Sequence, residues 1–70
     1  MKNNKETTSW VIKNKTNGMF FNRDNRYSYT KKIKNARLFP SRQIARNCIV
    51  ENECVKKVLT HNNIAVDIIR

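Results

Sequence analysis

The pair Asn17-Gly18 is the feature that most restricts how this chain can fold. It contains the only glycine of the chain, and an Asn-Gly pair readily supplies the two positive-φ positions of a type I′ hairpin turn. Residues 9–14 before it alternate as a strand does, and the aromatic run 19–22 follows it. The sequence therefore predicts an N-terminal β-hairpin, preceded by a flexible N-terminus over residues 1–8.

The length of the hairpin loop sets which side chains face the core. A two-residue loop pairs Thr16 with Met19 and Asn14 with Phe21. The residues that this register places together on one face are Trp10, Ile12, Met19 and Phe21. Phe20 then lies outside with Lys13 and Lys15. A loop one residue longer would exchange the two faces.

Two short helices are expected after the hairpin. Residues 23–26 form a polar turn, and residues 27–29 form either a third short strand or an extended lead into a helix. Thr30 is placed to cap a short helix that ends near Leu38. Pro40 disfavours helix at the residue before it, so the chain breaks there.

A second helix is predicted over residues 41–51, with Ser41 as its cap. Its apolar stripe has the spacing of one helix face and consists of Ile44, Ala45, Cys48 and Ile49. Asn52 is the stop signal.

The C-terminal residues predict a pair of strands. Residues 54–60 and 64–69 are rich in Val and Ile and flank the turn His61-Asn62-Asn63. A longer helix that runs on to about Thr60, through Val55 and Leu59, remains the alternative. The last strand has apolar residues on both faces, which predicts a central or well-covered position.

Seventy residues allow one domain. We expect a small single α+β domain over residues 9–70. Its N-terminal β-hairpin, one or two short helices and C-terminal strand pair would form one antiparallel sheet with the helix of residues 41–51 on one face.

Positive charge is the main functional signal of the sequence. The net charge is +10, from 15 Lys and Arg and 5 Asp and Glu. Ten basic residues and one acid fall between Lys13 and Arg46, so this segment carries +9. Such a concentration of charge favours a polyanionic partner, whether nucleic acid, an acidic protein face or anionic lipid.

The candidate binding residues mix cations with tyrosines, which together supply phosphate contacts and a stacking surface for bases. Arg42 and Arg46, one helical turn apart, could clamp phosphates or carboxylates. The candidates are Lys13, Lys15, Arg23, Arg26, Tyr27, Tyr29, Lys31, Lys32, Lys34, Arg37, Arg42 and Arg46. The simpler interpretation is that Tyr27 and Tyr29 pack in the core and the lysines form a solvated face.

The inventory for catalysis is thin. With one His, two Cys and five acids, the sequence shows no nucleophile beside a base, paired carboxylates or phosphate loop. Cys48 and Cys54 match neither a redox pair nor a zinc set, so we expect reduced, half-buried thiols. His61 is expected to be exposed and idle. We therefore expect neither an enzyme nor a cofactor or metal.

No apolar run approaches the roughly 20 residues of a membrane-spanning helix, and the first eight residues lack the apolar segment of a signal peptide. These features predict a cytoplasmic protein.

Residues 10–46 show a pattern of a hairpin followed by A-x-x-F-x-S-x-x-x-A, formed by Ala36, Phe39, Ser41 and Ala45. This pattern resembles small proteins of phages and prophages of low-GC Gram-positive bacteria. The resemblance implies packing and capping roles for these four residues, a bacterial host cytoplasm as the location, and no particular activity. This chain is much more basic than such proteins.

Two functional hypotheses follow. The first is a binding module for DNA or RNA that acts mostly by phosphate contacts through the basic surface. The alternative is a phage-encoded protein that uses the same face to inhibit or modulate an acidic host protein, such as a defence factor or a nucleic-acid enzyme. Exposed aromatics such as Phe20 or Tyr29 would dominate the second kind of interface.

Overall fold

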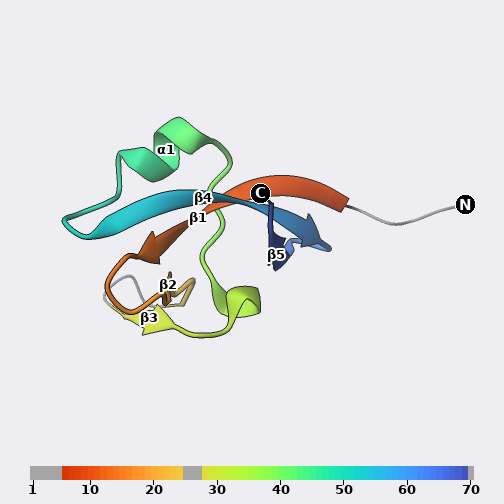
Figure 1. The fold of residues 1–70 in the computed structure, drawn as a ribbon. Helices are drawn as coiled ribbons and strands as arrows, with labels where there is room; N and C mark the ends of the chain where they lie inside the picture. Colours follow the sequence, from red (N-terminus) through yellow and green to blue (C-terminus); the bar gives the residue numbers. More distant parts are fainter. Residues whose placement is uncertain (1–5, 25–27, 70) are drawn as a thin grey trace, which may run out of the picture.

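A computed structural model describes residues 6–24 and 28–69, which form a small, mostly β domain (Figure 1). The elements are β1 (Glu6–Asn14), β2 (Phe20–Phe21), β3 (Tyr29–Thr30), a 3-10 turn η1 (Ile33–Asn35), α1 (Arg42–Arg46), β4 (Glu53–His61) and β5 (Ile64–Ile68). The strands make one five-stranded antiparallel sheet in the order β3-β2-β1-β4-β5. The fold is thus α+β in its coarse class, with little helix.

The longest pairing joins β1 to β4, from Glu6 opposite His61 to Asn14 opposite Glu53. The alternative of a helix running to Thr60 is therefore wrong, because these residues are strand. The expected flexible N-terminus is also too long, because residues 6–8 belong to β1; residues 1–5 lie outside the described part. The hydroxyls of Thr7 and Thr60 are 2.6 Å apart across the two strands, which ties the start of β1 to β4.

Both faces of the β1–β4 pair are covered. Val11 and Ile12 are neighbours in β1 and both are completely buried, and neighbouring residues of a strand point to opposite faces. Val11 packs with Phe20, Ala36, Val58 and Ala65 on one side, which we call the Val11 face. Ile12 packs with Phe39 and Ala45 on the other, the Ile12 face.

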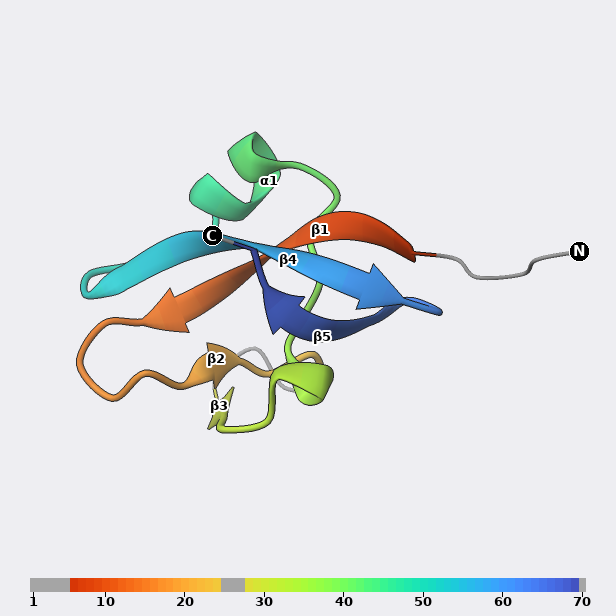
Figure 2. The same cartoon turned by 45° about the vertical axis from the view of Figure 1, so that its right-hand side comes forward.

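The two short helical elements lie on opposite sides of this strand pair (Figures 1 and 2). α1 provides Ala45 to the Ile12 face. Ile33 of η1 packs against the Val11 face. The sheet therefore separates two small apolar clusters, and each cluster has its own cover.

The hairpin register differs from the predicted one. Lys13 pairs with Phe20, and the Asn14 N–H donates to the Met19 carbonyl over 2.8 Å, so the predicted pairs Thr16–Met19 and Asn14–Phe21 are wrong. The loop spans residues 15–18 because Oδ1 of Asn14 accepts the N–H groups of Thr16 and Asn17, which begins the turn two residues early.

The change of register by two residues preserves the faces, because the side-chain period is two. Phe21 lies on the Ile12 face, as the predicted face assignment requires. Phe20 was expected outside but is only 8% exposed. It is buried because the Val11 face is covered as well.

The helices are shorter than predicted. α1 ends at Arg46, and of its expected stripe Ala45 is buried while Ile44 and Cys48 are exposed. The helix expected from Thr30 to Leu38 is reduced to η1. Sheet-like pairing competes with it: Thr30 lies in β3, Ala36 bridges to Asn22, and Arg37 donates its N–H to the Phe21 carbonyl.

β5 is an edge strand with exposed Ile64 and Val66, so the prediction of a central or well-covered position is wrong. Asn62 and Asn63, with φ of 55° and 66°, make a tight turn that returns the chain along the free edge of β4. The other edge of β4 is already taken by β1. As a result Val66 remains 49% exposed and Ile64 38% exposed.

The cap of α1 gives a direct test of the fold. Oγ of Ser41 accepts the N–H of Ile44 at 3.1 Å, so Ser41→Ala should lower the free energy of unfolding by about 1 kcal/mol. Ser41→Asn, which keeps an acceptor oxygen, is the matched control and should retain most of the stability. Urea denaturation measures both variants. Equal stability of Ser41→Ala and the wild type would show that the cap contributes nothing.

Candidate nucleic-acid interface

Trp10 is the meeting point of cations from two other elements. Cζ of Arg42 in α1 lies 5.9 Å from the centroid of the Trp10 ring, and Nζ of Lys57 in β4 lies 5.7 Å from it. Lys57 is directly opposite Trp10 in the β1–β4 register. Paired backbone hydrogen bonds of 3.0 and 2.8 Å between Trp10 and Phe39 fix the strand at this point. The Trp10 ring is therefore in contact with two exposed cations from different elements.

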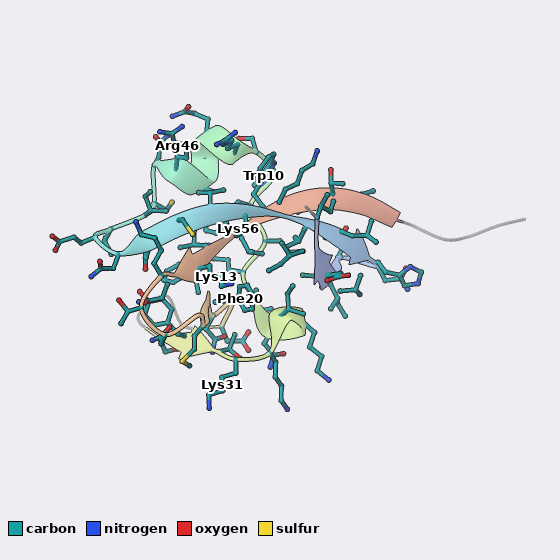
Figure 3. The ribbon with its side chains drawn as sticks, viewed as in Figure 1. Trp10, Lys13, Phe20, Lys31, Arg46 and Lys56 are labelled. Carbon is teal, nitrogen blue, oxygen red and sulfur yellow. The ribbon has the colours of Figure 1, made fainter. Side chains whose placement is uncertain are left out.

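Two further arginines extend this surface. Cζ of Arg37 lies 5.8 Å from the centroid of the buried Phe39 ring. Arg46 follows Arg42 by one helical turn, and the two line an open cleft of about 280 Å³. We call this set the α1 surface; it consists of Trp10, Arg37, Arg42, Arg46 and Lys57. Figure 3 shows Arg46 and Trp10 on the α1 side of the strand pair.

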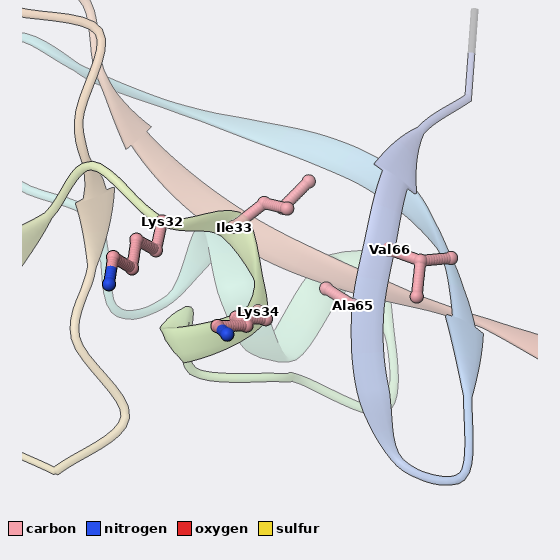
Figure 4. Close-up of a pocket in the computed structure, with 5 residues that line it drawn as sticks. All are labelled: Lys32, Ile33, Lys34, Ala65 and Val66. Carbon is pink, nitrogen blue, oxygen red and sulfur yellow. The ribbon is translucent and has the colours of Figure 1, made fainter.

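A second group of cations surrounds η1. Lys31, Lys32 and Lys34 are all exposed, and we call them the η1 surface. A cleft of about 400 Å³ lies beside η1 and β5 (Figure 4). It is lined by Lys32, Ile33, Lys34, Ala65 and Val66. Figure 3 shows Lys31 on the side of the strand pair opposite Arg46.

The remaining predicted cations lie apart from these two surfaces. Lys13 projects onto the Val11 face, where its Nζ lies 6.0 Å from the centroid of the Phe20 ring, and it lines a cleft of about 370 Å³ with Lys56. Lys15 is exposed in the hairpin loop. Arg23 faces Asp24 across 3.9 Å. Arg26 and Tyr27 lie outside the described residues.

Tyr29 makes contacts within the domain through both its hydroxyl and its ring. Its hydroxyl donates to Oε2 of Glu53, and its ring meets Phe21 edge-on with centroids 6.3 Å apart. Glu53 is only 7% exposed and also accepts the Val50 N–H over 2.8 Å. The contact joins β3 to β4 across the sheet. The hydroxyl and the ring of Tyr29 are therefore both in contact with other residues of the domain.

The hydrogen bond to Glu53 is the main reason why the pKa of Tyr29 is raised above its ordinary value of 10.0. The Asn14 side chain acts in the opposite direction, while burial and the negative charge of Glu53 add to the increase. The folded protein thus favours the neutral phenol.

No cation of the two basic surfaces forms an ion pair with a carboxylate among the described residues, although Glu53 lines the cleft beside Arg42 and Arg46. Across residues 6–24 and 28–69, the single ion pair is that between Arg23 and Asp24. Glu53 is occupied by Tyr29 and Val50, and Oδ1 of Asp67 accepts the Ile68 N–H at 2.8 Å. The positive charge of the α1 and η1 surfaces is consequently available to an outside partner.

Lys56 and Lys57 are not among the binding residues predicted from the sequence. Both fall among the last twenty residues, whose charges sum to zero: three acids against three cations. Two adjacent lysines in a strand point to opposite faces, and this was the one available signal. Their neighbours Val11 and Trp10 follow from the β1–β4 register alone.

The structure also places the two cysteines and the histidine of the sequence analysis. Cys48 is exposed, contrary to the expected half-buried thiol, and Cys54 is half-buried; both are free. His61 is half-buried at the end of β4 rather than exposed. No group of three metal-ligating side chains comes together in the described part of the chain. No helix among those residues is long and apolar enough to cross a membrane.

Comparisons with known proteins do not place the chain in a family. No family model matches it, no curated protein matches it, and no solved structure matches its fold. The resemblance of residues 10–46 to phage proteins stays a prediction.

The Tyr29–Glu53 contact predicts a measurable loss. Tyr29→Phe leaves a buried carboxylate without one of its donors, so it should lower the free energy of unfolding at neutral pH by about 2 kcal/mol. Because the folded pKa is raised, the stabilisation is complete below the pKa of the unfolded tyrosine and disappears as pH rises through the folded pKa. Urea denaturation across this alkaline range should show a steeper loss for the wild type than for Tyr29→Phe.

A titration isolates the cause. In a Tyr27→Phe background one tyrosine remains, and its phenolate absorbance should give a pKa above 10.0. Glu53→Gln should bring that pKa back toward 10.0. An unchanged pKa in Glu53→Gln would contradict the assignment.

Proposed function

We propose that the protein binds nucleic acid through the α1 surface, by phosphate contacts with little preference for sequence. The observation that supports this most is the position of Arg42 and Lys57 over Trp10, with no carboxylate paired to either among the described residues. Phosphate contacts from Arg and Lys position a protein on nucleic acid without reading bases.

The contact with Trp10 prepares the two cations for binding. A free Lys or Arg side chain loses rotamer entropy when it binds, and this loss weakens association. A ring beneath the charged group restricts the side chain in advance, and Arg keeps donors on its guanidinium edge while it stacks. Arg42 and Lys57 therefore present partly ordered charges, as Arg37 does over Phe39.

The aromatic residues favour phosphate contacts over base stacking. The Trp10 ring already carries two cations, Phe39 is buried, and Tyr29 is committed to Glu53. A base that stacked on Trp10 would compete with Arg42 and Lys57 for contact with the ring. The same chemistry serves DNA and RNA, because both carry a phosphate backbone.

The salt dependence of binding tests this proposal. Four cations of the α1 surface that each neutralise one phosphate predict a slope of about −3.6 for log affinity against log salt on a DNA duplex. The triple variant Arg42→Ala/Arg46→Ala/Lys57→Ala should reduce the magnitude of that slope by about 3, equally for unrelated sequences. Fluorescence anisotropy with labelled single- and double-stranded oligonucleotides measures both.

Lys15→Ala/Arg23→Ala is the control, since it removes cations outside both surfaces and should change the slope much less. Absence of binding to any oligonucleotide near physiological salt would reject the proposal. That outcome would direct the search to the alternative, an acidic host protein inhibited through the same face.

Trp10 also reports on the site directly, because it is the only tryptophan. A phosphate that draws Arg42 or Lys57 away from the ring should change Trp10 emission, and the change should follow the same salt dependence as the anisotropy. Arg42→Ala/Lys57→Ala should abolish the emission change. An unchanged emission on saturation of the wild type would place the nucleic acid elsewhere.

A further inference from the structure

The cations of this protein lie on opposite sides of its central strand pair. Adjacent residues Lys56 and Lys57 pair with Val11 and Trp10, which point to opposite faces. α1, which carries Arg42 and Arg46, packs on the Ile12 face through Ala45. η1 packs on the Val11 face through Ile33, and the exposed Lys31, Lys32 and Lys34 lie in or next to it. The basic segment predicted as one surface is thus divided by the β1–β4 pair (Figure 3).

A single duplex is too stiff to contact both sides. The domain measures 44 × 22 × 22 Å, whereas duplex DNA resists bending over a persistence length of about 500 Å. A duplex held on the α1 surface therefore continues nearly straight past the domain and leaves the η1 surface free. The three η1 lysines are exposed and have no carboxylate partner in the described part of the chain.

We infer that one molecule of this protein bridges two duplexes, one on the α1 surface and one on the η1 surface. The inference rests on the proposed function, because it assigns the first duplex to that site. The η1 surface would bind by the same sequence-independent phosphate contacts.

Bridging by a single molecule is favoured over bridging by a dimer. The net charge of +10 makes two copies repel each other. Within a bridge, each duplex supplies negative charge on one side, and the domain between them carries cations toward both. The complex of two duplexes therefore reduces charge repulsion without any contact between protein copies.

A capture assay tests the inference. One biotinylated duplex is fixed on beads, and a second fluorescent duplex of unrelated sequence is added with the full-length protein; both are far shorter than the persistence length. Capture of the fluorescent duplex should rise with protein concentration and then fall in excess protein, when each duplex is saturated by separate molecules. This rise and fall is expected of a two-site bridge.

Matched variants separate the two surfaces. Lys31→Ala/Lys32→Ala/Lys34→Ala and Arg42→Ala/Arg46→Ala/Lys57→Ala each remove three exposed cations. The η1 variant should still bind one duplex by anisotropy, the α1 variant should bind much more weakly, and neither should capture the second duplex. A mixture of the two should not restore capture, and Lys15→Ala/Arg23→Ala should capture as the wild type does. Circular dichroism confirms that each variant is folded.

The outcomes distinguish the two claims. If the wild type binds no oligonucleotide, single- or double-stranded, in the anisotropy assay, the proposed function is wrong; if it binds single strands alone, only the bridge is wrong. If it binds one duplex but never captures a second, the bridge is wrong and the function stands. Capture that persists in the η1 variant, or that returns on mixing the two variants, would also overturn the inference, because a dimer of one-surface molecules would then explain it.

Discussion

The antiparallel pairing of β1 with β4 supports every other part of this domain. The pairing runs over the full nine residues of each strand, and Val11 and Ile12 from its middle are completely buried on opposite faces. A chain of this size buries only a modest share of its surface. Here the buried residues form two small clusters, one under α1 and one under η1. The strand pair thereby determines both the stability of the domain and the separation of its charges.

Two kinds of polar contact complete this framework. The Tyr29–Glu53 hydrogen bond connects β3 to β4 and uses a buried acid. Arg37, Arg42 and Lys57 contact the rings of Phe39 and Trp10, and none of the three is paired with a carboxylate among the described residues. The domain thus satisfies its buried polar groups internally and leaves its positive charge at the surface. That distribution is the physical basis of the proposed binding to phosphate backbones.

Local chemistry in the sequence predicted some elements well and others poorly. The Asn-rich turn and the strands around it were predictable because β-branched residues and positive-φ asparagines act locally. The hairpin register was not predictable, because the Asn14 side chain accepts hydrogen bonds from the N–H groups of Thr16 and Asn17 and so starts the turn earlier. Phe20 and β5 were misplaced for a different reason: whether a face is covered depends on segments distant in the sequence.

The sequence by itself determined the net charge, the strand-rich composition and the concentration of cations between Lys13 and Arg46. These follow from residue identity and from alternation along the chain. Only the tertiary structure decided which cations lie together. Lys57 meets Trp10 because β4 pairs with β1 in one particular register, and the η1 lysines lie opposite α1 because the sheet stands between them. Register and coverage are contacts between residues far apart in the chain, and no local pattern specifies them.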